Sequence, residues 1–197
     1  MPSNQTQHLL EQEWNPARSK IKAAIENGLS ESYFKVGSLL YLGAAHGYTI
    51  THLYDKYTST VHVYAVEKSP EMMRAFIPVA QDLPNVLPIL ADAGAPDSFA
   101  HYIQEEVDVV FQDIAQKNQV DIFMANCRRF LNTHGVGILS LKAPAVNSTA
   151  EPAAVFAETR NQLEKAGMTV AQEVSLEPYQ KHHRLYVVHP ADEHAYF

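Results

Sequence analysis

The chain has 197 residues, of which 46% are hydrophobic and 19% are charged, and its formal net charge is −7 at pH 7. This length and composition are typical of one globular domain with a sizeable core, and they exclude a disordered chain. The negative net charge disfavours a protein that binds nucleic acid without a partner, because such proteins usually carry an excess of basic residues.

Cysteine usage and the first residues indicate the compartment. Cys127 is the single cysteine, so there is no disulfide framework and a reducing compartment is expected. Residues 1–13 form a short polar segment that lacks the apolar core of a secretory signal. No apolar run approaches the ~20 residues of a membrane span. We therefore expect a cytoplasmic protein with no membrane partner, and a single domain over residues 14–197.

The first expected helix follows Trp14. Asn15 can cap it, Pro16 suits its first turn and Gly28 can end it. Its apolar stripe consists of Ala17, Ile21, Ala24 and Ile25. Lys20 stands at the edge of that stripe, so its side chain can lean over the core instead of into water.

The most informative segment comes next, where the apolar run Leu39–Leu42 stops at Gly43. Small residues lead to Gly47, a helix-like segment follows, and a second apolar run, Val61–Val66, ends at Glu67. Glycines let a ligand approach the backbone, and an acid twenty residues after Gly47 can hold two ribose hydroxyls. This order predicts the first half of a nucleotide-type site, although a strand, a turn and a surface glutamate would explain the same letters.

Strand-like runs continue to the end of the chain, separated by helix-length segments. Further strands are expected at Val86–Leu90, Val107–Phe111, Val136–Leu141, Thr169–Val174 and Leu185–Val188. Helices are expected at Glu71–Gln81, Asn118–Leu131 and Val155–Lys165, the last after a capping box from Ser148 to Glu151. Apolar strands alternating with helices predict an α/β fold with a largely parallel, seven-stranded sheet. The segment Leu176–Arg184 leaves no room for a crossover helix, so the last strand should run antiparallel.

Ionisable side chains stand at the ends of several expected strands. Glu67, Asp113 and Lys142 end their runs, and Asp92 follows another. Because the carboxyl ends of parallel strands line one crevice, we expect these groups to converge in a functional site.

Lys142 is the candidate base among them. It follows a buried run, so its stem should be buried and its amine presented at the crevice. Lysines act as bases when burial and a second ammonium, here that of Lys20, favour the neutral amine. A plain alternative is that Lys142 extends from the strand end and pairs with Asp113. His183 begins the last strand; the histidines show no helical HExxH or CxxC spacing, so no metal is expected.

Several blocks of the sequence resemble the fibrillarin family, and archaeal fibrillarin-like proteins in particular. They are Trp14-Asn15-Pro16-x-Arg18-Ser19-Lys20, Leu40-Tyr41-Leu42-Gly43-Ala44-Ala45, Val63-Tyr64-Ala65-Val66-Glu67, Asp113-Ile114-Ala115-Gln116, Leu141-Lys142-Ala143, and Leu176-Glu177-Pro178-Tyr179 with His183. The blocks appear in order over nearly the whole chain, and the first and last are specific to this family.

The resemblance implies a Rossmann-like class I methyltransferase that uses S-adenosyl-L-methionine to methylate the 2′-hydroxyl of ribose in rRNA and tRNA. Members work inside a box C/D ribonucleoprotein, in which a guide RNA selects the nucleotide of the substrate RNA. The implied partners are a Nop-type scaffold protein and a kink-turn-binding protein of ribosomal type. An acidic subunit that borrows its RNA specificity from such a particle agrees with the net charge of −7.

The resemblance also assigns residues. The implied cofactor contacts are Gly43, Tyr48, Thr49, Glu67, Lys68, Asp92, Ala93, Asp113 and Gln116. The implied catalytic set is Lys20, Asp113, Lys142 and His183. We expect neutral Lys142 to take the 2′-proton and Lys20 to stabilise the developing oxyanion. Asp113 would orient the lysines and the sulfonium end of the cofactor, and His183 would fix Lys20 or the ribose.

The chain departs from the family at two cofactor positions and near its start. Lys68 stands where the family commonly has an aromatic residue over the adenine, and Tyr48 where it usually has a small hydroxyl residue. The family normally carries a β-rich N-terminal extension, whereas few residues precede Trp14 here.

Three alternative functions differ in class. A dinucleotide oxidoreductase is disfavoured because no third glycine follows Gly47 at the required offset. A small-molecule or unguided methyltransferase would suit the acidic charge. A cofactor-binding structural subunit with weak or no catalysis is compatible with the departures at Tyr48 and Lys68.

Overall fold

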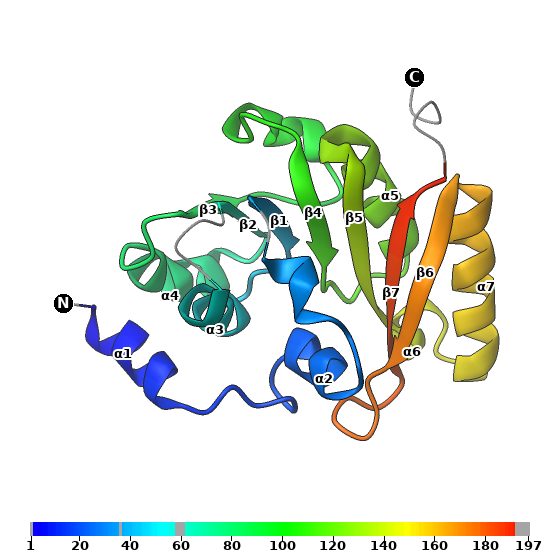
Figure 1. Ribbon diagram of the computed structural model, residues 1–197, viewed down its shortest axis with the longest axis horizontal. Coiled ribbons are helices and arrows are strands. Elements are labelled where there is room, and N and C mark those ends of the chain that lie inside the picture. Colours follow the sequence, from blue (N-terminus) through cyan, green and yellow to red (C-terminus); the bar gives the residue numbers. More distant parts are fainter. Residues whose placement is uncertain (1, 36, 58–61, 192–197) are drawn as a thin grey trace.

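A seven-stranded sheet forms the centre of the protein (Figure 1). The computed structural model describes residues 2–35, 37–57 and 62–191. The strands are β1 Ser38–Leu42, β2 His62–Glu67, β3 Val86–Leu90, β4 Val107–Gln112, β5 Leu131–Lys142, β6 Met168–Ser175 and β7 His183–Pro190. All seven predicted strands are confirmed, and β5 begins earlier than the predicted Val136. Val61 and residues 192–197 lie outside the described residues.

The strands are arranged in the order β3-β2-β1-β4-β5-β7-β6. β1 pairs parallel with β2 and β4, β2 pairs parallel with β3, and β4 with β5. β7 pairs antiparallel with both β5 and β6. The largely parallel sheet with an antiparallel last strand is therefore confirmed. The insertion of β7 between β5 and β6 did not follow from the order of the runs.

Helices cover both faces of the sheet (Figure 1). They are α1 Asn4–Glu11, α2 Lys20–Glu26, α3 Tyr48–Tyr57, α4 Pro70–Ala80, α5 Gln119–Phe130, α6 Ala143–Val146 and α7 Pro152–Lys165. Ile21 of α2, Ile50 of α3 and Phe76 of α4 belong to one buried cluster. Phe123 of α5 and Leu163 of α7 belong to a second cluster. The helix-like segment predicted directly after Gly47 matches α3, and the three helices predicted after it match α4, α5 and α7.

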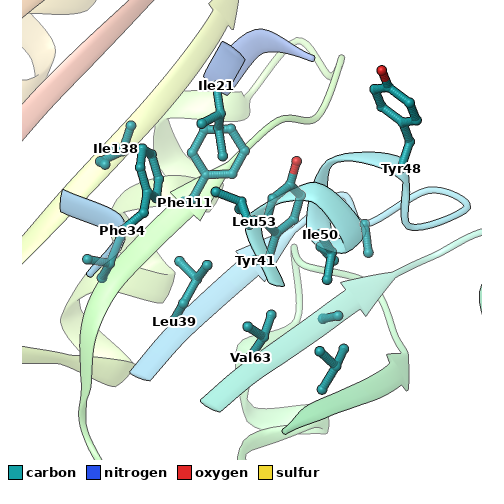
Figure 2. Close-up of a cluster of buried hydrophobic side chains, with 14 of the residues drawn as sticks. Ile21, Phe34, Leu39, Tyr41, Tyr48, Ile50, Leu53, Val63, Phe111 and Ile138 are labelled. Atoms are coloured by element: carbon teal, nitrogen blue, oxygen red, sulfur yellow. The ribbon is translucent and has the colours of Figure 1, made fainter. Parts of the chain in front are cut away.

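The alternation of side chains along β1 separates these two clusters. Leu39 and Tyr41 lie in the first cluster, whereas Leu40 and Leu42 lie in the second. Successive side chains of a strand point to opposite faces, so a central strand covered on both sides must be apolar throughout. Figure 2 shows the first cluster, in which Tyr41 lies close to the Phe111 side chain from β4.

The start of α2 differs from the prediction. The helix begins at Lys20, and the Ser19 hydroxyl caps it by accepting the Lys22 amide at 3.2 Å. Asn15 instead forms a tight turn, in which its carbonyl accepts the amides of Arg18 and Ser19. An early cap at Asn15 is therefore wrong, and Lys20 occupies the first position of the helix.

The predicted capping box before α7 is also wrong. The helix begins at Pro152 and its N-cap residue, Glu151, makes no side-chain capping bond. The Asn147 side chain accepts the amides of Thr149 and Ala150 at 3.0 and 3.2 Å, which fixes an earlier turn and moves Ser148 away from the helix start.

The polar N-terminal segment contains α1. Ser3 caps this helix, and Asp82 after α4 anchors it by accepting the Ser3 amide at 2.7 Å and the Thr6 hydroxyl at 2.6 Å. Within the described ranges, every helix is too short or too polar to cross a bilayer.

Candidate active site

The glycine turn after β1 brings the ends of two strands into close contact. Gly43 has a φ of +92°, and a Cβ added to it would lie 2.2 Å from the Asp113 carbonyl oxygen. The amides of Gly43 and Ala44 both donate to the Val66 carbonyl, at 2.9 and 3.0 Å. A side chain at position 43 would force β1 and β4 apart, so glycine is required here.

A cavity of about 300 Å³ opens at this edge of the sheet. Seven of the predicted cofactor residues line it, namely Gly43, Glu67, Lys68, Asp92, Ala93, Asp113 and Gln116. They come from the ends of β1, β2, β3 and β4. The predicted convergence at the carboxyl edge is therefore confirmed for Glu67, Asp92 and Asp113, and it follows from the parallel strand order, whereas Lys142 does not line this cavity.

Glu67 is fixed by two backbone amides. One carboxylate oxygen accepts the Ala45 amide at 2.8 Å, and the other accepts the Ser69 amide at 2.7 Å. A carboxylate offers about four lone-pair sites, so each oxygen can accept a further hydrogen bond from a ligand hydroxyl.

Lys68 and Asp92 form an ion pair beside the cavity. Their Nζ and Oδ2 atoms lie 2.6 Å apart, and the two side chains are 62% and 40% exposed. The hydrogen bond from Lys68, and then that from the Gly94 amide, hold the pKa of Asp92 below its ordinary value. The second acid of the cavity is thus charged and oriented.

The Asp113 carboxylate pairs with Lys20. Lys20 Nζ and Asp113 Oδ2 are 3.0 Å apart, and both side chains are largely covered. The alternative in which Asp113 pairs with Lys142 is therefore wrong. The reason is the position of α2, which lies below the end of β4 in Figure 1 and begins with Lys20, so that this lysine meets Asp113.

Lys142 and His183 lie opposite each other across the β5–β7 pair. Lys142 is exposed, so the expectation of a buried stem is wrong; β5 ends there and the chain turns into α6. Burial lowers the pKa of His183, the Lys181 carbonyl raises it, and the charges of Lys20, Asp113 and Lys142 all act on it. The four predicted catalytic residues thus form two pairs, Lys20–Asp113 and Lys142–His183, at the ends of β4, β5 and β7, and we refer to them together as the predicted catalytic group.

Tyr48 and Thr49 are absent from the cavity wall in the described structure. The Tyr48 hydroxyl accepts the Asn15 amide at 2.9 Å and donates to the Glu13 carbonyl at 3.0 Å. The Thr49 hydroxyl lies 3.1 Å from that of Ser19. A cofactor contact through the Tyr48 hydroxyl is therefore wrong, because the chain before α2 occupies that group.

Sequence reasoning missed the contribution of Ala45, whose amide orients Glu67 and which itself lines the cavity. The signal was present in the run of small residues between Gly43 and Gly47, because such residues leave backbone amides accessible.

The strand order, with an antiparallel β7 inside the sheet, and the cavity at the carboxyl edge of β1–β4 define a Rossmann-like class I methyltransferase fold. Within that class the chain belongs to the fibrillarin family, because the Fibrillarin family model matches residues 5–191.

Known proteins agree with this assignment. The fibrillarin-like rRNA/tRNA 2′-O-methyltransferase of Methanococcus voltae is 41% identical over 175 residues, which are 88% of this chain and 76% of that protein. A fibrillarin/Nop5p complex matches with a TM-score of 0.83 and 36% identity, over 90% of this chain and 84% of the other. Aeropyrum pernix fibrillarin with natively bound S-adenosyl-L-methionine matches with a TM-score of 0.80 and 36% identity, over 89% and 76%.

Proposed function

We propose that this chain is an S-adenosylmethionine-dependent methyltransferase that modifies the 2′-hydroxyl of ribose in rRNA and tRNA. It acts as the catalytic subunit of a box C/D ribonucleoprotein, in which a guide RNA selects the nucleotide. The observation that carries the proposal is the position of Asp113, which lines the cavity and pairs with Lys20 at 3.0 Å, while Lys142 and His183 pair at the adjoining ends of β5 and β7. The names of the relatives support the same reaction.

The cavity suits the proposed cofactor. Gly43 has no side chain, so a ligand can approach the backbone there. The Glu67 carboxylate can accept hydrogen bonds from two ribose hydroxyls. Asp92 can accept a hydrogen bond from the exocyclic amine of adenine. The negative charge of the Asp113 carboxylate favours binding of the positively charged sulfonium. The Aeropyrum pernix relative, which binds S-adenosyl-L-methionine, supports this assignment.

The chemistry divides between the cofactor and the side chains. When bound, S-adenosylmethionine supplies an activated methyl group on a sulfonium, so the chain must deprotonate and align the acceptor. Lys142 takes the 2′-proton as general base, and Lys20 stabilises the negative charge that develops on the oxygen. Asp113 holds Lys20 in place through their ion pair. RNA that docks over this edge covers the exposed Lys142 amine and removes water from around it.

The partners follow from the same assignment. The chain binds a Nop-type scaffold protein, as its relative does in the fibrillarin/Nop5p complex. Box C/D guide RNA, substrate RNA and a kink-turn-binding protein complete the particle. The net charge of −7 supports a subunit that depends on the particle for its RNA affinity.

The test is transfer of labelled methyl from S-adenosylmethionine to a guide-paired RNA in a reconstituted box C/D particle. One control uses a target RNA that carries 2′-deoxyribose at the selected nucleotide. A second control uses a particle assembled with a mismatched guide RNA. Label should appear in the ribose target and not in the 2′-deoxyribose target, and it should be lost with the mismatched guide. This result would support methyl transfer, the 2′-hydroxyl as the acceptor and selection by the guide RNA.

Two other outcomes would contradict the proposal. Absence of label in an assembled particle would indicate a structural subunit. Label that is independent of the guide would indicate an unguided methyltransferase.

A further inference from the structure

The turn Asn15–Ser19 leads directly into Lys20 and is held by the first turn of α3. The Tyr48 hydroxyl makes two bonds to the backbone of this segment, accepting from Asn15 and donating to Glu13. Tyr48 is 4% exposed, so these bonds are protected from water. A buried hydroxyl with both donor and acceptor roles satisfied fixes the backbone that it contacts.

A second tie lies one residue further along α3. The Thr49 and Ser19 hydroxyls are 3.1 Å apart, and Ser19 is the residue that caps α2. Because Lys20 is the first residue of α2, the two ties set both the position and the direction of the helix start.

The Tyr48 ring adds a third contact. The Arg18 guanidinium lies 4.0 Å from the Tyr48 ring centroid, and the His52 ring packs edge-to-face against the Tyr48 ring, with the two centroids 4.7 Å apart. Figure 2 shows Tyr48 at one side of the buried cluster, with its hydroxyl directed away from the strands. Packing therefore holds the Tyr48 ring in place, and the hydroxyl forms its hydrogen bonds to the segment before Lys20.

The turn is also held from the side of the last strand. Gln180 Nε2 donates to the carbonyls of Pro16 and Ala17 at 3.1 and 2.6 Å. Gln180 precedes β7, which begins with His183. The segment before Lys20 is thus fixed between α3 and the loop that leads to His183.

We propose that Tyr48 is a positioning residue for methyl transfer, whose hydroxyl fixes the Asn15–Ser19 turn so that Lys20 meets Asp113 beside the acceptor oxygen. The inference rests on the proposed function, because Lys20 must act in the reaction. It assigns Tyr48 a role in the orientation of a catalytic amine instead of in cofactor binding. Small misplacements of a catalytic group cost large factors in rate.

The test compares Tyr48→Phe, which removes the hydroxyl alone, with Tyr186→Phe in the reconstituted particle. Tyr186 is a matched control, because its buried hydroxyl also donates to a backbone carbonyl, that of Phe156, at 2.8 Å. We expect Tyr48→Phe to lower kcat about tenfold, with the KM for RNA and the Kd for S-adenosylmethionine within about twofold. Tyr186→Phe should retain wild-type kcat.

A double-mutant cycle separates positioning from loss of structure. In a Lys20→Ala background, Tyr48→Phe should lower kcat no further, because the group that it positions is gone. An unchanged kcat in Tyr48→Phe, or losses that simply multiply in the double variant, would overturn the inference. A wild-type particle without activity would instead contradict the proposed function. If Tyr48→Phe fails to fold, Thr49→Val, which removes the second tie and keeps the Ser19 cap of α2, goes through the same cycle with the same expectation.

Discussion

The Lys20 ammonium lies 3.0 Å from the Asp113 carboxylate, and this ion pair joins the first turn of α2 to the end of β4. Asp113 also lines the cavity, and its carbonyl lies against Gly43. One residue therefore contacts both the glycine turn and the lysine. Asp113 thus connects the cavity wall to the Lys20 amine through its backbone and its side chain.

Replacement of Lys20 should separate catalysis from cofactor binding. Lys20→Ala should lower methyl transfer by roughly 100-fold or more, because an electrostatic contact to the developing oxyanion is lost. The Kd for S-adenosylmethionine, measured by titration calorimetry, should stay within a few fold. A large loss of cofactor affinity with unchanged kcat would assign Lys20 to the cofactor site instead.

Lys142 should be indispensable for the chemical step. Lys142→Ala should reduce single-turnover methyl transfer by about 100- to 10,000-fold, the usual contribution of a general base, and leave cofactor affinity within a few fold. Lys165→Ala, which changes a lysine at the end of α7, serves as the control. Parallel loss of activity and affinity at Lys142 would contradict its role as the base.

An aromatic residue at position 68 should strengthen cofactor binding. The Lys68–Asp92 pair is substantially exposed, so it contributes about 0–1 kcal/mol and is easily given up. A ring stacked on adenine contributes about 1–3 kcal/mol. We expect Lys68→Phe to lower the Kd for S-adenosylmethionine at least about fivefold. Lys68→Ala, which removes the ion pair without adding a ring, should not; equal gains in both variants would show that the ion pair alone hinders binding.

His183 should report the charges around it in an NMR titration. Burial lowers its pKa, the positive charge of Lys20 lowers it, and the negative charge of Asp113 raises it. Lys20→Met should therefore raise the pKa of His183, and Asp113→Asn should lower it. Unchanged midpoints in both variants would place His183 outside the group.

The same shift has a consequence for stability. Because the folded-state pKa of His183 lies below 6.5, the unfolded chain binds the proton first as the pH falls. The contribution of the neutral His183 side chain to the free energy of unfolding is complete above pH 6.5. It is lost as the pH falls through the folded-state pKa of His183. Denaturant titrations of wild type and His183→Asn should diverge in the neutral range and converge in acid; parallel curves would contradict this linkage.

Gly43 should tolerate no side chain. Gly43→Ala combines a positive φ, which costs about 1–3 kcal/mol, with a Cβ 2.2 Å from the Asp113 carbonyl oxygen. Gly28 is a matched control, because its φ is +98° but no atom lies within 4 Å of an added Cβ. Chemical denaturation should show a clearly larger loss for Gly43→Ala than for Gly28→Ala. Equal losses would show that backbone strain, and not the contact with β4, is responsible.

The strands and the cavity could be predicted because they depend on local patterns. Apolar runs that end in Gly43, Glu67 or Asp113 determine both the buried strands and the residues at their ends. The Lys20–Asp113 ion pair could not be predicted from the sequence, where the named alternative paired Asp113 with Lys142, because the pair depends on where α2 begins. The side chain of Tyr48 was misassigned for a related reason, since its partners lie in the segment before that helix.

The position of β7 has a consequence for synthesis on the ribosome. Among the described strands β7 comes last in the sequence and is made after β5 and β6, yet it lies between them and carries His183 at its start. A nascent chain that still lacks β7 exposes the edges of β5 and β6, and unpaired edges favour association between chains. The predicted catalytic group is therefore complete only after β7 has been made, and products truncated before β7 lack His183.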